Sequence, residues 1–164
     1  MDWILGFGVD DLNAVILWLY RPAGGGKSAI AHDIAQRCEL EKLLLASFFS
    51  RSDPARSNAK SLIATIAYQI AINIPGTREK IVATIERDPL ILTRSLEAQV
   101  AALVVEPLHE MLEAGYFNAP TSRRLIIIDA LDECDTPAVQ CNILQVISLL
   151  FHVYHLPFLI LVTS

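Results

Sequence analysis

The chain has 164 residues, 53% of them hydrophobic, and a formal net charge of −5 at pH 7. This length suits one domain with a sizeable buried core, and the acidic balance excludes a broad electrostatic surface for nucleic acid. Three cysteines without framework spacing and an N-terminus without a basic region indicate a reduced, cytoplasmic protein, not a secreted one.

The first third of the chain predicts a strand, a helix and a second strand. The apolar run from Ala14 to Tyr20 predicts the first strand, and a glycine-rich loop follows it directly. Apolar residues at helical spacing then predict a helix from Ser28 to about Glu39. A second strand is expected at Leu43–Phe49, before a polar loop over residues 50–58.

The middle of the chain is predicted to be helical. Apolar spacing indicates helices over residues 59–73 and 78–87, and a third one from Leu96 to Leu112. Pro107 predicts a kink or a break in the third helix, because proline lacks an amide N–H and clashes with the preceding turn. Residues 115–122 are expected to form a loop.

The last third returns to strands. Leu125–Ile128 is an apolar, β-branched run typical of a buried strand, and Pro137 suits the first turn of a helix that runs to about His152. Phe158–Val162 is the last predicted strand. Strands that alternate with helices predict right-handed crossovers, a parallel sheet and an α/β fold.

Two segments qualify this domain organisation. We expect residues 1–13 to be a short lead-in and residues 14–164 to be one domain, which stops directly after its fourth core strand and so looks C-terminally incomplete. Residues 143–163 carry no formal charge and are roughly long enough to span a bilayer. Polar residues and Pro157 interrupt this run, so we expect a buried helix and strand and no membrane span.

The glycine-rich loop between the first strand and the first helix predicts a phosphate site. Glycines let backbone N–H groups converge around an anion, and the following helix directs its positive end to the same place. Lys27 can then reach the β- and γ-phosphates, and the Ser28 hydroxyl can ligate Mg²⁺. The residues expected to bind nucleotide are Pro22, Ala23, Gly24, Gly25, Gly26, Lys27, Ser28 and Ala29.

Arg21 departs from the usual form of such a loop, G-x-x-x-x-G-K-[ST], because it stands where the first glycine would be. It lies at the exit from the strand, so we expect distortion more than loss of the site, and its charge could also reach nucleotide. The alternative for the whole loop is a glycine-rich connection without a ligand.

An acidic cluster follows the predicted strand at residues 125–128. Asp129 lies at the tip of that strand, where a carboxylate is costly unless it binds a cation or hydrogen-bond donors, and we expect it to hold Mg²⁺ together with Ser28. Asp132 or Glu133 could orient a water for attack on the γ-phosphate, with a slight preference for Asp132. The alternative is an acidic turn that caps the next helix, which we prefer for Asp135.

The other reactive side chains predict no second site. The four histidines are scattered, and His152 and His155, three apart on one predicted helix, lack acidic or cysteine partners at metal-ligand spacing. Cys134 follows acidic residues, which argues against a lowered thiol pKa and redox chemistry. Trp18 is expected in the core.

Several segments together resemble the fungal NACHT family, STAND-type NTPases often labelled nephrocystin-like N-terminal domains. The resemblance covers about residues 14–164. The segments that carry it are Trp18–Tyr20, Gly26–Ile30, Ala46–Pro54, Ala59–Gln69 and Leu125–Cys134.

The resemblance implies a three-layer P-loop NTPase of the ASCE type, in which the strand at 158–162 lies between those leading to Lys27 and Asp129. It also implies a nucleotide-driven switch within a larger receptor of NOD-like architecture, with protein partners or self-association in that context. In relatives an arginine follows Thr163–Ser164 to form a γ-phosphate sensor, and glycine usually occupies positions 21 and 130.

These patterns lead to a hypothesis of Mg²⁺-nucleotide binding with slow hydrolysis. ATP is favoured by analogy, and GTP remains open although no guanine-reading Asn-Lys-x-Asp stretch occurs. The rival is a degenerate, non-catalytic module that binds nucleotide, a protein or neither. A small-molecule P-loop kinase is a third class, but no arginine-bearing lid is recognisable.

Overall fold

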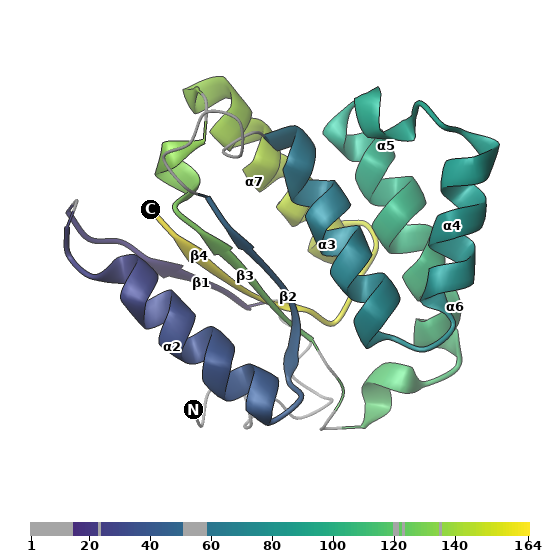
Figure 1. The fold of residues 1–164 in the computed structure, drawn as a ribbon, viewed down its shortest axis with the longest axis horizontal. Helices are drawn as coiled ribbons and strands as arrows, with labels where there is room; N and C mark the ends of the chain where they lie inside the picture. The colour runs from purple at the N-terminus through teal and green to yellow at the C-terminus, as the bar shows by residue number, and fades with distance from the viewer. Residues whose placement is uncertain (1–14, 23, 51–58, 120–121, 123, 135) are drawn as a thin grey trace.

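The computed structural model describes residues 15–22, 24–50, 59–119, 122, 124–134 and 136–164 (Figure 1). Its centre is a parallel sheet of four strands in the order β1-β4-β3-β2. The strands are β1 (Val15–Leu19), β2 (Leu44–Phe49), β3 (Leu125–Asp129) and β4 (Leu159–Thr163). The expected α/β fold is confirmed, and β4 lies between β1 and β3 as the family resemblance implies.

The two central strands are apolar up to their last residues because both of their faces are covered. Every residue of β3 and β4 is buried. Ile126 and Ile128 point into a large apolar cluster on one face, whereas Leu125 and Ile127 point into a smaller cluster on the other. This alternation follows from the two-residue period of a strand, and it fixes which face each later side chain of β3 takes.

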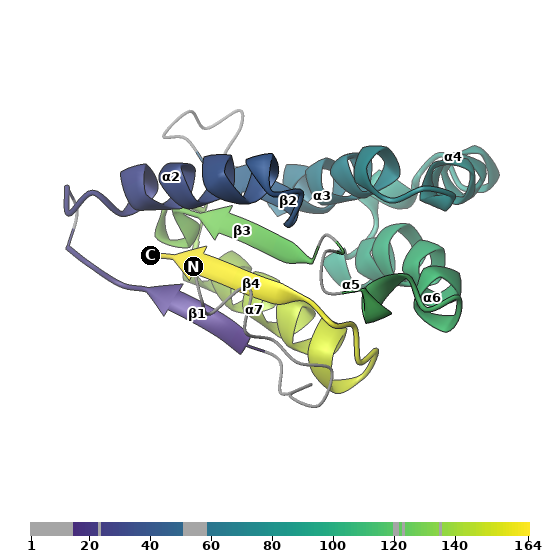
Figure 2. The ribbon, with the colours of Figure 1, turned by 90° about the horizontal axis from the view of Figure 1, so that it is seen from below.

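Helices lie on both sides of the sheet and produce three layers (Figure 2). Helix α2 (Lys27–Leu40) packs on the face of Ile127, and it buries the small residues Ala31, Ala35 and Cys38 there. Helices α3 (Ala59–Asn73), α5 (Leu96–Val100) and α7 (Pro137–His152) contribute to the larger cluster on the opposite face.

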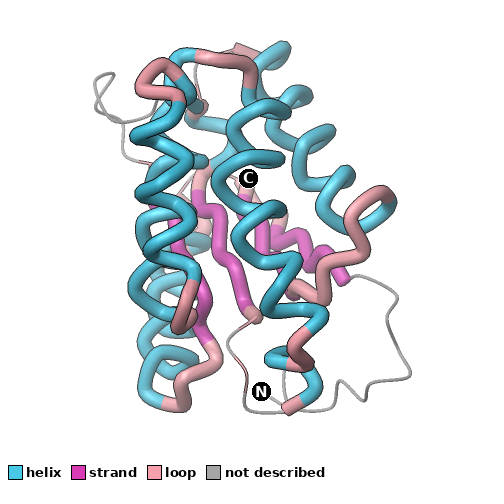
Figure 3. The backbone as a smooth tube through the Cα atoms, turned by 90° about the vertical axis from the view of Figure 1, so that its right-hand side faces the viewer, coloured by secondary structure: helices cyan, strands magenta, loops and turns pink. Residues whose placement is uncertain are grey.

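The remaining helices lie on the side of α3 that faces away from the sheet (Figure 1). Figure 3 looks from that side and shows helices in front of the magenta strands. Helix α4 (Thr77–Arg87) packs beside α3, and α6 (Glu106–Glu113) packs beside α4. The described residues also include three short 3₁₀ turns: η1 (Ile91–Thr93), η3 (Tyr116–Asn118) and η4 (Leu131–Glu133).

Pro107 does not end the third predicted helix, because a local change of helix type accommodates it. Between α5 and α6 the chain forms a π-helical turn, η2 (Ala101–Val105), in which the Glu106 N–H bonds to the Ala101 carbonyl five residues earlier. A π turn widens the helix at the point where the proline ring would meet a carbonyl of the preceding turn. The helical path therefore continues past Pro107 to Glu113.

Two local predictions were wrong. Trp18 is 48% exposed because β1 is an edge strand, and its Nε1 donates to Ser164 Oγ at 2.6 Å. His155 does not share a helix with His152, because α7 ends at His152 and His155 has a left-handed backbone with φ of 50°.

Some predictions fall on residues that the structure does not describe. The lead-in at 1–13, most of the polar loop at 50–58, Ala23 and Asp135 lie outside the described residues. Among the residues that are described, no helix has the length and apolar character to cross a membrane.

Candidate functional site

Four residues form a row across the sheet at the carboxyl ends of its strands. Leu19 at the end of β1 is paired in register with Thr163 of β4, and Phe49 at the end of β2 is paired with Asp129 of β3. Ile128 pairs with Val162, so Asp129 and Thr163 are also level with each other. In parallel α/β sheets, ligands bind at this end.

All four side chains of the row face α2. Leu19 and Phe49 pack against the cluster that α2 shares with the sheet. Asp129 and Thr163 follow Ile127 and Leu161 of that same cluster by two residues, so they point to the same face. The row therefore lies on the face where the glycine-rich loop enters α2.

The Asp129 carboxylate is 2% exposed and is held by a hydroxyl group. Thr163 Oγ1 donates to Asp129 Oδ1 at 2.6 Å, and it accepts from the Ala130 N–H at 2.9 Å. Within the described part of the chain, Asp129 Oδ2 accepts no hydrogen bond. The pair thus fixes one oxygen and leaves the other for a cation or a donor.

The sequence prediction missed this role of Thr163. It considered Thr163 only beside the sensor arginine of relatives. The signal was present, however: a hydroxyl residue ends an apolar strand at the same edge at which Asp129 ends its own strand.

The glycines of the loop are required for different reasons. Gly24 and Gly26 have φ of 79° and 75°, a left-handed conformation that other residues rarely adopt. A Cβ on Gly25 would lie 2.9 Å from the Pro22 carbonyl oxygen, which accepts the Gly25 N–H at 3.0 Å. A side chain at any of these three positions would disturb the loop.

Helix α2 begins at Lys27, and its N-cap residue Gly26 supplies no side-chain acceptor for the first-turn N–H groups. Ser28 and Ala29 are exposed in this first turn. The uncapped N–H groups and the positive end of the helix dipole favour an anion here.

Lys27 and Arg21 bond to the loop itself. Lys27 Nζ donates to the Arg21 carbonyl at 2.6 Å, and the Arg21 guanidinium donates to the Gly25 carbonyl at 3.4 Å. The Arg21 N–H also reaches the Ser164 carbonyl at 3.5 Å, which ties the loop to the end of β4. In this conformation both cationic side chains of the loop are folded back onto its own backbone.

The two candidates for water activation lie just beyond Asp129. Ala130 turns the chain with φ of 58°, and Asp132 and Glu133 follow in η4, both exposed. Gln140 Nε2 of α7 donates to the Asp132 and Cys134 carbonyls and holds this turn.

The row and the glycine-rich loop lie at the same end of the sheet. β4 lies between β1 and β3, so the ends of these two strands are about 10 Å apart. A bound triphosphate and its metal can bridge such a gap.

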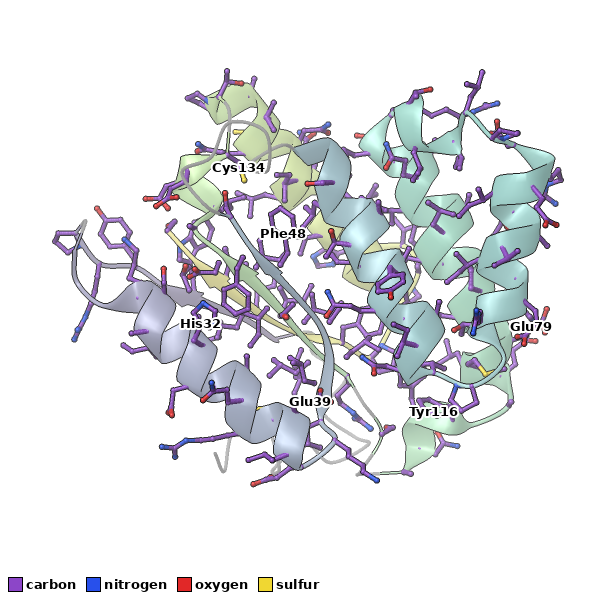
Figure 4. The ribbon with its side chains drawn as sticks, viewed as in Figure 1. His32, Glu39, Phe48, Glu79, Tyr116 and Cys134 are labelled. Carbon is purple, nitrogen blue, oxygen red and sulfur yellow. The ribbon has the colours of Figure 1, made fainter. Side chains whose placement is uncertain are left out.

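His32 lies on the turn of α2 after Ser28 (Figure 4). Its ring stacks on Phe49 with ring centroids 3.9 Å apart, which anchors α2 to β2.

Two titratable groups with perturbed pKa values, Cys38 and Arg124, belong to the packing of the fold. Burial raises the pKa of the Cys38 thiol, and the Glu41 carboxylate raises it further, which disfavours a reactive thiolate. Burial lowers the pKa of Arg124, whose guanidinium donates to the Phe117 and Ala119 carbonyls at the opposite end of β3. Among the described residues, no group of three or more His, Cys, Asp or Glu side chains forms a metal site.

Comparison with known families identifies the family of this chain. A family model described as "Nephrocystin 3, N-terminal" matches residues 8–164, which include the glycine-rich loop and the whole sheet. The chain belongs to the nephrocystin 3 N-terminal family. No curated protein and no solved structure matches this nephrocystin 3 N-terminal domain in the same comparisons.

Proposed function

We propose that this nephrocystin 3 N-terminal domain binds a Mg²⁺-nucleoside triphosphate, preferably ATP, between the glycine-rich loop and Asp129. The observation that carries the proposal is the position of the buried Asp129–Thr163 pair, which lies at the same end and on the same face of the sheet as the start of α2. This position supports a single site in which the loop would hold phosphate and the carboxylate would hold its metal.

The residues present suit Mg²⁺. This ion prefers oxygen ligands, and in phosphate sites it uses one or two protein side chains and completes its shell with phosphate and water. The Ser28 hydroxyl and Asp129 Oδ2 would supply the protein oxygens. The ion, when bound, would neutralise charge on the phosphates.

The loop residues would hold the phosphates. First-turn N–H groups of α2 and the amides around Gly24 and Gly26 would donate to phosphate oxygens, because no side chain caps this helix. The Lys27 ammonium would leave the Arg21 carbonyl for the β- and γ-phosphates. Arg21 itself lies at the entrance of the loop and would bond to phosphate only after leaving the Gly25 carbonyl.

The proposal includes slow hydrolysis in a switch module of a NACHT-type, NOD-like signalling protein. Asp132 or Glu133 would orient the attacking water from η4. We expect slow turnover because Arg21 is engaged with the loop, and an arginine supplied to the transition state is worth roughly 10³–10⁵ in rate. Protein partners or self-association of the larger protein belong to the same proposal.

Titration of a fluorescent ATP analogue into the purified domain, with and without Mg²⁺, tests the binding. Lys27→Ala should weaken binding by about 10- to 150-fold, because a hydrogen bond to a charged group contributes roughly 1.5–3 kcal/mol. Lys42→Ala is the matched control, since Lys42 is a lysine just beyond the opposite end of α2. Mg²⁺-independent binding, or equal binding by Lys27→Ala and the wild type, would contradict the proposal.

Phosphate release separates the enzyme from its rival, the non-catalytic nucleotide-binding module. The rival is favoured by the inward-bonded Arg21 and Lys27 side chains. Release faster than that of an Asp132→Ala/Glu133→Ala double variant would support hydrolysis. Equal release, with intact binding, would support the rival.

A further inference from the structure

A hydrophobic groove runs between α3 and α4, away from the proposed nucleotide site at the start of α2. It encloses a volume of about 580 Å³. Its walls carry apolar side chains at helical spacing on both helices. Among these residues are Ala64, Tyr68, Ala71 and Ile72 of α3 and Val82 and Ile85 of α4.

Helix α3 is apolar outside one polar stripe. No formal charge occurs from Ser61 to Gly76, and one face of the helix is buried in the core. On the groove face, Tyr68 and Ile72 are 67% and 64% exposed. An exposed apolar patch with a polar rim is typical of an interaction site.

The polar side chains of Gln69 and Asn73 on α3 do not line the groove, because they bind the backbone of β2. Gln69 bonds to both the N–H and the carbonyl of Ser47, and Asn73 Nδ2 donates to the Leu45 carbonyl at 2.7 Å. These amides occupy the free edge of β2. The groove face is therefore left with alanines, isoleucine and one tyrosine.

Among the described residues that line the groove, Arg78 supplies the one charge. The neighbouring cations are neutralised: Lys80 pairs with Glu110, Arg87 with Glu106, and Arg94 with Asp88. Arg78 is exposed and has no ion pair within the described part of the chain. A complementary ligand thus needs an apolar body and an acid at the α4 N-terminal end.

We propose that the groove docks an amphipathic α-helix of a protein partner, with an acidic side chain placed against Arg78. A helix satisfies its own backbone hydrogen bonds, whereas a strand would leave backbone groups unpaired against apolar walls. Ala64 and Ala71 are small enough to admit a helix at the close spacing of packed helices. A second copy of this surface does not fit as well, because two grooves placed face to face leave the hollow unfilled.

The test is a phage-displayed library of helical peptides of about 15 residues, or about 22 Å of helix, selected on the full chain. Selected peptides should share an apolar stripe with an acidic residue at one end. One selected peptide is then synthesised and its affinity is measured by fluorescence anisotropy. Ile72→Glu and Arg78→Glu should each weaken its binding by about tenfold or more, as the loss of an anchor residue of an interface does. Replacing the peptide's acid by lysine should restore binding to Arg78→Glu.

The controls keep the result decisive. Leu40→Glu changes an exposed leucine on α2, outside the groove, and should leave peptide binding unchanged. Circular dichroism checks that each variant folds. Selected peptides that bind Ile72→Glu as tightly as they bind the wild type would overturn the proposal. The proposal would also be overturned by a concentration-dependent dimer that Ile72→Glu abolishes, because the occupant would then be a second copy of the chain. Binding of laurate, a fatty acid, without binding of any helical peptide would overturn it as well.

Discussion

Thr163 shows how much one hydroxyl contributes at the end of a buried strand. It donates to Asp129 Oδ1 and accepts from the Ala130 N–H, while its own side chain is fully buried. Both partners lie at the carboxyl end of β3, beside β4, so the Thr163 hydroxyl satisfies both groups at once. The hydroxyl therefore determines where the carboxylate sits.

Replacing Thr163 by valine should destabilise the domain. Thr163→Val leaves a buried carboxylate oxygen and a backbone N–H without a partner, and each such loss costs about 1–3 kcal/mol. We expect the free energy of unfolding in urea to fall by about 2–4 kcal/mol. Thr163→Ser keeps the hydroxyl and should lose less than half as much. An unchanged free energy of unfolding in Thr163→Val would contradict a stabilising role for the bond.

At the scale of elements, α2 connects the candidate site to the rest of the fold. It begins at the glycine loop without a side-chain cap and ends in a tight turn at its other end. There the Leu43 N–H bonds to the Cys38 carbonyl and the Lys42 N–H to the Glu39 carbonyl, which is the Schellman arrangement. Lys42 has φ of 57°, at a position that glycine usually occupies.

Lys42→Gly should therefore stabilise the domain. The left-handed conformation costs a residue with a Cβ about 1–2 kcal/mol, and the extra freedom of glycine in the unfolded chain offsets about 0.4–1 kcal/mol. A net gain of up to about 1 kcal/mol is expected in thermal or urea unfolding. Lys42→Ala keeps the Cβ and should not show this gain, so a similar gain from alanine would point to the lost charge.

At the scale of the whole molecule, the parallel sheet separates two apolar clusters. The smaller one lies under α2 and includes Leu161, and the larger one contains Ile70 of α3. The same two strands, β3 and β4, supply side chains to both clusters. Loss of packing on either face should therefore weaken the entire domain.

Ile70→Ala and Leu161→Ala test this expectation, one on each face of the sheet. Both side chains are almost completely buried, so each variant should lose about 2–5 kcal/mol of unfolding free energy. Circular dichroism and tryptophan fluorescence should follow one coincident transition in urea. Ile72→Ala, in the exposed groove, should stay within about 0.5 kcal/mol of the wild type. Two separate transitions would contradict a single cooperative unit.

Local patterns predicted the positions of all four strands and of the main helices, because apolar period, glycine and proline act within a few residues. They also singled out the glycine loop and Asp129, since a buried carboxylate at a strand tip stands out in any sequence. Strand order followed from the family resemblance and not from the pattern alone.

Other features depended on contacts between segments far apart in the chain. Trp18 reads as a core residue, yet it is exposed because β1 lies at the sheet edge. Thr163 meets Asp129 only through strand pairing across 34 positions of sequence. The amphipathic pattern of α3 likewise gave no hint that Gln69 and Asn73 would bind the β2 edge and leave an apolar groove. Local chemistry determined the elements and the candidate ligands; their packing decided which side chains are buried, paired or left open to a partner.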